Sequence, residues 1–318
     1  MNQIKHVLVV FGTRPEAIKM GPVVKELERY TDHFRVTVCV TAQHREMLDQ
    51  VLEIFNIVPD IDLSIMKPNQ SLFDITARIL RKMEQVVKNV KPDLMIVHGD
   101  TTTSYVAALA AFYEKIPVGH VEAGLRTGNL YSPFPEEFNR KSVGLIANYH
   151  FAPTEISKQN LMREGYSEES IYVTGNTAID ALKYTVKKNY SHPLLKWVRD
   201  SKLIMITAHR RENLGQPMRN MFKAIKRVLI ENEAIKAIYP VHLNPKVQQI
   251  ADEVFGEMSQ VKLIEPLNVT DFHNFLNHAY LILTDSGGIQ EEAPSLGKPV
   301  LVMRDTTERP EGIKAGTL

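Results

Sequence analysis

The sequence is poor in cysteine and almost balanced in charge. Cys39 is the only cysteine in 318 residues, which excludes an intramolecular disulfide, and its place in the apolar run 36–40 favours a buried, unreactive thiol. Lysine and arginine number 38 against 37 aspartates and glutamates, which excludes the broad positive field of proteins that bind nucleic acids non-specifically. We therefore expect a cytoplasmic protein without a nucleic-acid partner, in which any anionic ligand is held by local groups.

Long apolar runs are also missing. The run 7–11 near the N-terminus is too short for the core of a signal peptide, and the charged residues Arg14 and Glu16 follow it. No later segment supplies the roughly 20 apolar residues that cross a bilayer. The sequence predicts a soluble protein that does not associate with membranes.

Common nucleotide and metal motifs are missing as well. The first apolar run leads into Gly-Thr-Arg-Pro-Glu and not into the G-x-G-x-x-G turn of dinucleotide-binding proteins, and a Walker A lysine loop is absent. The sequence holds no H-E-x-x-H motif, and its 11 histidines show no local grouping at metal-ligand spacing. We expect no metal site, no bound NAD and no ATP hydrolysis.

Short β-branched runs alternate with segments of helical period along the chain. This alternation predicts parallel strands joined by crossover helices, and therefore an α/β fold. The predicted strands form two series, 4–12, 34–42, 93–99, 117–122, 149–153 and 171–175, then 202–209, 235–242, 261–266, 280–285 and 299–303. Helices are predicted between them, among others over 16–30, 71–88, 103–114, 217–231 and 245–255. We expect two Rossmann-like, doubly wound parallel sheets facing a cleft, where open α/β sheets bind their ligands.

The length of the chain also favours two domains. Its 318 residues are about twice the commonest domain size. The polar stretch 187–202 separates the two strand series, and a helix predicted over 176–184 follows the last strand of the first series. We place the boundary near Gly175, with an N-terminal domain over 1–175 and a C-terminal domain over 176–318.

The first predicted strand ends in a turn that suits an anion. Gly12 permits a tight turn, and Thr13 with Glu16 matches the capping box S/T-x-x-E. Arg14 and Lys19, about one helical turn apart, stand beside the helix N-terminus, whose free N–H groups and partial positive charge attract phosphate or carboxylate. A capped surface helix with solvated cations is the alternative interpretation.

Three carboxylates follow neighbouring elements of the first series. Asp100 and Glu122 stand at the ends of two predicted strands, and Glu136 lies in the loop before the next helix. If they converge on one cleft they resemble an acid/base set, because burial and crowding raise carboxyl pKa values and keep a proton available near neutrality. Helix capping and surface positions explain the same residues equally well.

The second series offers two candidate anion sites. The buried strand 202–209 runs into the basic run 209–211, and the strand 280–285 is followed by the Ser-Gly-Gly turn 286–288, where glycine lets backbone N–H groups approach phosphate oxygens. Glu292 lies four residues past that turn, about 6 Å along a helix, which places it to accept the hydroxyls of a ribose. A solvated turn and an ordinary strand-to-helix turn are the alternatives.

Taken together, these motifs resemble the bacterial non-hydrolysing UDP-N-acetylglucosamine 2-epimerase family. The resemblance runs from residue 4 to the end of the sequence and rests on six strings in order, FGTRPE (11–16), HGDT (98–101), HVEAGLRT (120–127), PEE (135–137), HRREN (209–213) and DSGGIQEE (285–292). It implies the two-domain glycosyltransferase-B fold and the interconversion of UDP-N-acetylglucosamine and UDP-N-acetylmannosamine. The implied mechanism is an anti elimination of UDP to 2-acetamidoglucal followed by re-addition, which needs no redox cofactor.

The resemblance also assigns roles to single residues. Asp100, Glu122 and Glu136 match the acid/base carboxylates, with base and acid not distinguished, and His209 is grouped with them as catalytic. The positions that bind the departing diphosphate are matched by Arg14, Lys19, His209, Arg211, Ser286, Gly287 and Gly288. Glu292 matches the ribose-binding acid, and Phe272 and Arg309 match positions near the nucleotide.

Regulation and assembly are implied in the same way. Gln43, Gln70 and His242 match positions of a second, allosteric UDP-N-acetylglucosamine site. The family is commonly homodimeric, and its product supplies N-acetylmannosamine for cell-surface polysaccharides. The family extends a few tens of residues past the position of Leu318, including a C-terminal helix. We therefore expect the C-terminal domain to be truncated, and a chain truly ending at Leu318 to be less stable and less active.

Other activities fit parts of the same pattern. A hydrolysing epimerase would release UDP and free N-acetylmannosamine from the same intermediate. A sugar-nucleotide glycosyltransferase shares the fold, although transfer needs fewer acids than the three carboxylates supply. A catalytically inactive nucleotide-sugar sensor is a third alternative, disfavoured by the intact carboxylates and His209.

Overall fold

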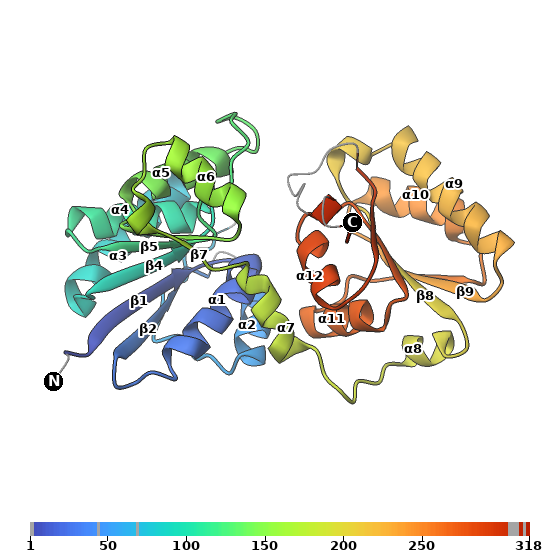
Figure 1. Cartoon of the computed structure of the whole chain (residues 1–318), viewed down its shortest axis with the longest axis horizontal. Helices are drawn as coiled ribbons and strands as arrows, with labels where there is room; N and C mark the ends of the chain where they lie inside the picture. The colour runs from blue at the N-terminus through green and yellow to red at the C-terminus, as the bar shows by residue number, and fades with distance from the viewer. Residues whose placement is uncertain (1–2, 43–44, 68–69, 305–311, 314–315) are drawn as a thin grey trace. The chain divides into compact units, whose positions relative to one another are not determined.

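The computed structural model describes residues 3–42, 45–67, 70–304, 312–313 and 316–318 (Figure 1). The chain divides into two compact units, Met1–Ala181 (unit 1) and Leu182–Leu318 (unit 2). In the described ranges, every helix is too short or too polar to cross a membrane.

Unit 1 is built on a parallel sheet with strand order β3-β2-β1-β4-β5-β6-β7. Its strands are β1 (Lys5–Phe11), β2 (Phe34–Val40), β3 (Ile61–Asp62), β4 (Leu94–His98), β5 (Val118–Val121), β6 (Tyr149–Ala152) and β7 (Ile171–Val173). Side chains of the central strand β1 alternate between two cores, with Leu8 and Val10 in one and Val7 and Val9 in the other. A strand buried on both faces needs apolar residues at successive positions, which is why these strands read as continuous apolar runs.

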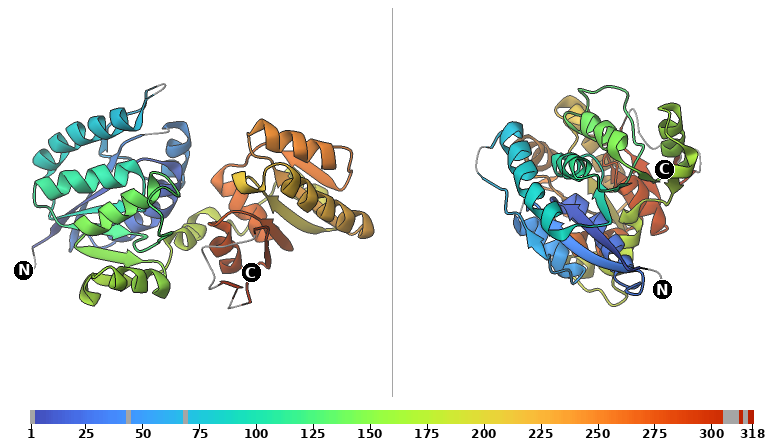
Figure 2. Two further views of the ribbon diagram at one scale, coloured as in Figure 1. Left: turned by 90° about the horizontal axis from the view of Figure 1, so that it is seen from above. Right: turned by 90° about the vertical axis from the view of Figure 1, so that its left-hand side faces the viewer.

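Helices cover both faces of this sheet, as the views in Figures 1 and 2 show. The helices of unit 1 are α1 (Arg14–Leu27), α2 (Arg45–Ile54), α3 (Leu72–Val90), α4 (Thr102–Tyr113), α5 (Glu136–Ile146), α6 (Glu155–Arg163) and α7 (Thr177–Thr185), which runs into unit 2. Residues of α3, α4 and α5 share one core, and residues of α1, α2 and α7 share the other. This is a doubly wound arrangement.

Unit 2 repeats the arrangement with strand order β10-β9-β8-β11-β12. Its parallel strands are β8 (Lys202–Thr207), β9 (Ile235–Pro240), β10 (Val261–Ile264), β11 (Leu281–Thr284) and β12 (Val300–Val302). Its helices are α8 (Pro193–Val198), α9 (Gln216–Glu231), α10 (Pro245–Phe255), α11 (Val269–His278) and α12 (Ile289–Ser295). Helices α9 and α10 cover one face, and α8, α11 and α12 cover the other.

The predicted α/β fold with two parallel sheets is confirmed. Every strand of both predicted series is present, and each ends one or two residues earlier than predicted. The strand predicted over 202–209 ends at Thr207, because the backbone N–H groups of His209 and Arg210 bond to Asp285 and not to a strand. Strand β3 was not predicted, because its two residues, paired with Cys39 and Val40, are too few to show a period.

Candidate functional site

The turn between β1 and α1 is held by a buried carboxylate. The predicted capping box is confirmed, since the side chain of Thr13 accepts from the N–H of Glu16, and the Glu16 carboxylate accepts from the N–H groups of Thr13 at 2.7 Å and Gly12 at 3.0 Å. Glu16 is only 1% exposed, unlike an ordinary surface cap. Arg14 opens this helix, and burial lowers the pKa of its guanidinium.

The same carboxylate reaches a second turn of unit 1. Its other oxygen lies 2.8 Å from the hydroxyl of Thr101 and 3.0 Å from that of Ser104, at the start of α4. Glu16 therefore joins the turn that carries Arg14 to the turn that carries Asp100. Burial raises the pKa of Glu16, and its hydrogen bonds oppose the rise. Sequence reasoning missed this role because the partners lie 85 and 88 residues away.

Lys19 and Glu122 form an ion pair in unit 1. The ammonium of Lys19 donates to a carboxylate oxygen of Glu122, whose side chain is 11% exposed. Nε2 of His98 lies 3.8 Å from the other oxygen of Glu122. Burial lowers the pKa of His98 to about 4, so its ring is neutral at neutral pH. The structure thus places Lys19 beside a protein carboxylate, and its contact with a ligand anion stays a prediction.

Asp100 follows β4 and is held by α5. The guanidinium of Arg140 donates to its carboxylate, and the side-chain amide of Asn139 donates to its backbone carbonyl at 2.9 Å. Burial raises the pKa of Asp100, and the positive charge of Arg140 opposes that rise. The like charges of Glu122 and Glu136 raise it further, so the structure brings the three predicted carboxylates into one electrostatic cluster.

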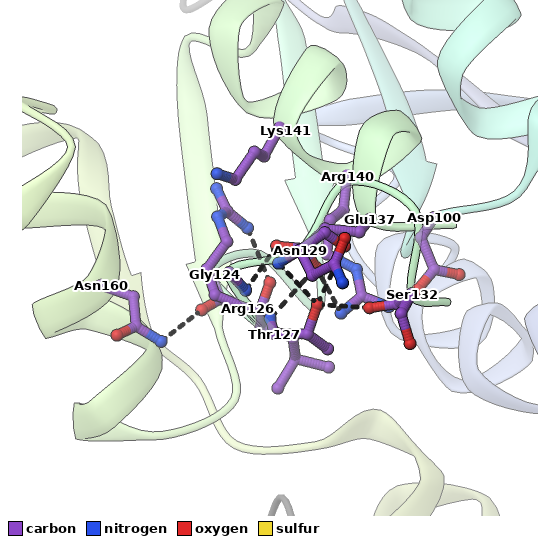
Figure 3. Close-up of polar contacts among 12 residues, drawn as sticks. Asp100, Gly124, Arg126, Thr127, Asn129, Ser132, Glu137, Arg140, Lys141 and Asn160 are labelled. Atoms are coloured by element: carbon purple, nitrogen blue, oxygen red, sulfur yellow. Dashed lines mark hydrogen bonds and ion pairs between the residues drawn. The ribbon is translucent and has the colours of Figure 1, made fainter. Parts of the chain in front are cut away.

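The loop from Glu122 to Glu136 is tied to α5 by hydrogen bonds (Figure 3). The Glu137 carboxylate, fully buried, accepts from the backbone N–H groups of Thr127 and Gly128, each at 3.2 Å. Its Oε2 also lies 3.3 Å from Nη1 of Arg140. Sequence reasoning missed Glu137 and Arg140, although their spacing of three residues in a predicted helix was an available signal.

Arg126 anchors the beginning of the same loop to α6. Its guanidinium donates to both carboxylate oxygens of Glu164, at 2.8 Å and 2.7 Å. Asn160 of α6 donates to the carbonyl of Gly124 at 3.0 Å (Figure 3). This end of the loop is therefore held by contacts that do not involve Asp100, Glu122 or Glu136.

In unit 2 a buried carboxylate organises the end of β8. Asp285 is fully buried and accepts from the backbone N–H groups of His209 and Arg210, both at 2.9 Å, and from the amide of Asn213 at 3.2 Å. Nδ1 of His209 lies 3.3 Å from Asp285, and its ring stacks on His242 with centroids 5.6 Å apart. Burial lowers the pKa of His209, and the charge of Asp285 opposes this. Asp285 was not predicted as a site residue.

The Ser-Gly-Gly turn joins β11 to α12 as predicted. The N–H of Ser286 donates to the hydroxyl of Thr284 at 3.0 Å, Gly287 follows, and Gly288 is the N-cap of α12. Glu292 keeps 15% of its side chain exposed and lies 3.5 Å from Nε2 of His273. A Cβ at Gly288 would lie 3.5 Å from its carboxylate, so Glu292 is adjacent to the turn.

The remaining predicted residues include His242, whose ring stacks on His209, and others that lie elsewhere or outside the described residues. Phe272 packs against the core beneath α11, and Gln70 accepts from Arg78 at 2.9 Å in unit 1. His242, in unit 2, accepts from the N–H of Asn244 at 3.1 Å. Gln43, Arg309 and the side chain of Arg211 lie outside the described residues.

Neither a metal cluster nor a reactive thiol is found in the part of the chain that the structure describes. There, no group of three or more histidine, cysteine, aspartate or glutamate side chains could hold a metal ion. Cys39 is buried in β2, and burial raises the pKa of its thiol to about 12.

Comparisons with known proteins identify what the chain resembles. A family model described as UDP-N-acetylglucosamine 2-epimerase matches residues 25–318. The UDP-N-acetylglucosamine 2-epimerase of Bacillus subtilis is 61% identical over 318 residues, covering 100% of this chain and 83% of that protein. The crystal structure of a putative UDP-N-acetylglucosamine 2-epimerase from Listeria monocytogenes matches with a TM-score of 0.94 and 55% identity, covering 99% of this chain and 83% of that one.

Two further structures bear on ligand and fold. The UDP-GlcNAc 2-epimerase of Neisseria meningitidis, solved bound to UDP-GlcNAc, matches with a TM-score of 0.87 and 51% identity, covering 98% of this chain and 86% of that one. A glycosyltransferase from Rickettsia africae matches with a TM-score of 0.61 at 12% identity, covering 98% of this chain and 82% of that one. The second likeness concerns the fold alone, which is glycosyltransferase-B-like.

Proposed function

The chain belongs to the UDP-N-acetylglucosamine 2-epimerase family and is an isomerase, and from that premise we propose how its residues carry out the reaction. In the proposed mechanism a base takes the proton from C2 of the sugar. The C1–O bond breaks with its electron pair going to UDP, which leaves 2-acetamidoglucal. A proton then returns to the opposite face of C2, and an oxygen of UDP attacks C1 to form UDP-N-acetylmannosamine.

We assign the proton transfers to unit 1. Inversion at C2 needs two groups that act on opposite faces of the sugar. Asp100, Glu122 and Glu136 supply carboxyls in different surroundings, since Asp100 faces Arg140 whereas Glu122 faces Lys19. The grouping of these carboxylates around Asp100 is the observation that carries the proposal, and the raised pKa of Asp100 supports it, because a carboxyl transfers protons most efficiently when its pKa lies near the working pH.

We assign the binding of UDP to unit 2. The C2 proton is not acidic, so the elimination depends on stabilising the diphosphate as it departs, which is a task for cations and backbone N–H groups. His209 and Arg211 with the turn 286–288 are assigned to the diphosphate. Glu292, partly exposed beside that turn, is assigned to the ribose hydroxyls. Arg14 and Lys19 of unit 1 are assigned to the substrate as well.

Proton NMR in deuterated water tests the mechanism. The protein is incubated with UDP-N-acetylglucosamine without nicotinamide or metal, and we expect UDP-N-acetylmannosamine with deuterium at C2. Product that retains hydrogen at C2 would contradict proton exchange through an elimination intermediate. Release of UDP and free N-acetylmannosamine would instead identify a hydrolysing epimerase.

We further propose regulation by a second substrate molecule, with Gln43, Gln70 and His242 as its contacts. The regulatory proposal predicts a sigmoidal dependence of the initial rate on UDP-N-acetylglucosamine, which H242A should make hyperbolic.

We also propose a cytoplasmic homodimer whose product supplies cell-surface polysaccharide. Sedimentation of the purified protein tests the dimer, and deletion of its gene followed by sugar analysis of the envelope tests the supply of N-acetylmannosamine.

A further inference from the structure

Arg140 is shared by two acidic side chains, the partly exposed Asp100 and the fully buried Glu137. It lies in the second turn of α5, with its side chain 12% exposed, and one end of its guanidinium pairs with Asp100. The other end lies 3.3 Å from the fully buried carboxylate of Glu137. A planar guanidinium can bond two acceptors in fixed directions, which an ammonium cannot do. The position of one side chain thus sets the relative positions of both acids.

The acid on the other side of Arg140 controls a loop. Glu137 accepts the N–H groups of Thr127 and Gly128, and these residues lie midway between Glu122 and Glu136. The backbone carbonyl of Asp100 is held independently by Asn139. A continuous path of contacts therefore runs from the loop N–H groups through Glu137 and Arg140 to the carboxylate of Asp100, as Figure 3 shows.

We propose that Arg140 is a positioning residue for the epimerisation, which orients the Asp100 carboxylate and, through Glu137, fixes the loop between Glu122 and Glu136. The proposal rests on the assignment of Asp100 to proton transfer made above. Arg140 acts through Asp100 and Glu137 and does not itself take or give the proton. Its charge also sets the protonation of Asp100, because it stabilises the ionised form of that carboxyl.

The charged groups around Asp100 come from several elements. On α5 they are Arg140, Glu136 and Glu137, and from the end of β5 comes Glu122 with its partner Lys19 of α1. His98, at the end of β4, is neutral at neutral pH. Arg140 is the cation that bonds Asp100 directly. When it is removed, Lys19 is the one cation among the groups named that still opposes the negative charges of this cluster.

The experiment compares R140M and R140K with a matched control. R126M removes an equally buried arginine of the same loop region, with a side chain 8% exposed, whose partner is Glu164 and not one of the three carboxylates. We expect R140M to lower kcat about 100-fold, which is the typical cost of a reacting group displaced by about 1 Å, with KM changed less than about threefold. R140K should fall between R140M and the wild type. R126M should stay within about threefold of the wild type in kcat.

A pH profile separates positioning from a merely structural effect. Without Arg140 the pKa of Asp100 rises, so the limb of the kcat/KM profile that reports Asp100 moves to higher pH by about one unit, whether Asp100 acts as acid or base. The profile of R126M should not move. An unmoved profile and a kcat within about threefold of the wild type for R140M would overturn the proposal, as would an equal shift in R126M.

Amide hydrogen exchange tests the loop without relying on turnover. We expect the N–H groups of Thr127 and Gly128 to exchange faster in R140M than in the wild type, because Glu137 loses the guanidinium that holds it. Unchanged exchange in R140M would overturn the link between Arg140 and the loop. D100N is measured in parallel, and full turnover of D100N would refute the assignment of Asp100 itself, whatever the exchange data show. R140K retains a positive charge and serves in all these measurements if R140M fails to fold.

Discussion

Two carboxylates of the predicted acid/base set in unit 1, Asp100 and Glu122, face cationic side chains, whereas the buried carboxylate Asp285 of unit 2 faces backbone N–H groups. In unit 1 Asp100 pairs with Arg140 and Glu122 with Lys19, and burial and crowding raise the pKa of Asp100. In unit 2 Asp285 accepts from the backbone at 209–210 and fixes the path of the chain there. The contacts in unit 1 alter the pKa of Asp100. The contacts in unit 2 hold the turn that carries the donors and cations assigned to the diphosphate.

The strongest test of this comparison is the substitution D100N. We expect turnover to fall by about 1,000-fold or more, because an amide cannot exchange the proton, while the affinity for UDP stays within a few-fold of the wild type. D93N is the matched control, since Asp93 is exposed and precedes the opposite end of the same strand. Turnover and equilibrium binding of UDP are measured for both variants. Unaltered turnover in D100N would remove this residue from the mechanism.

The converse test is D285N in unit 2. The Asp285 carboxylate accepts hydrogen bonds from the N–H groups of His209 and Arg210, whereas the side-chain amide of asparagine would place a donor beside them. The turn at 209–210 should therefore lose its anchor. We expect UDP to bind about 10- to 100-fold more weakly, corresponding to the loss of one or two hydrogen bonds to a charged acceptor. D252N, an exposed aspartate of α10, is the control. If D285N binds UDP as the wild type does, Asp285 does not shape the nucleotide site.

Acidification should weaken unit 1 through three histidines on adjacent strands. Burial lowers the pKa of His98 to about 4, of His120 to about 3 and of His150 to about 4. They are neutral when folded and take up protons when unfolded, so their contribution is present above pH 6.5 and is lost as the pH falls toward 4. The loss is at most about 1.4 kcal/mol per pH unit for each histidine.

Urea unfolding between pH 7.5 and 5, followed by hydrogen exchange, measures this effect in each unit. The free energy of unfolding of unit 1 should fall more steeply than that of unit 2, where His209, the described histidine with a lowered pKa, has a side chain that is 41% exposed. H150N should make the dependence shallower in unit 1. Equal pH dependence of H150N and the wild type would contradict the prediction.

The smallest expected effect concerns the packing of the first turn in unit 1. A Cβ at Gly12 would lie 2.0 Å from Oγ1 of Thr41 and 2.7 Å from Oγ1 of Thr103. G12A should therefore lower the free energy of unfolding by about 1 to 3 kcal/mol, the usual cost of overpacking. Its equivalent in unit 2 is G215A, where space is open but φ is +90°. Thermal melting compares the two, and a stable G12A would mean that the turn can widen.

Burial made most of the fold predictable. A strand such as β1, apolar at successive positions because both faces are covered, is readable from its own residues. The two residues of β3 carry no such signal and are a strand only because Cys39 and Val40 lie beside them. In parallel sheets the polar residue after a buried strand lies at the carboxyl edge, which is why Asp100 and Glu122 could be identified.

The rest of the site depends on partners distant in sequence. Glu16 was predicted as a cap from its neighbour Thr13, but its bonds to Thr101 and Ser104 depend on the pairing of β1 with β4. Arg140 reaches Asp100 across 40 residues in the same way. Residue type and spacing give local roles, and only the packed structure gives these long-range ones.

Glu16 bonds both its own turn and the distant start of α4, and this has a consequence for folding during synthesis. Strand β1 and its turn leave the ribosome early, but the hydroxyls of Thr101 and Ser104 that complete the surroundings of Glu16 are 85 and 88 residues behind. At about 5 to 20 residues per second, roughly 4 to 17 seconds of synthesis separate them. During that interval the carboxylate of Glu16 remains in water, and the first turn of the enzyme can take its final form only after β4 has been added beside β1.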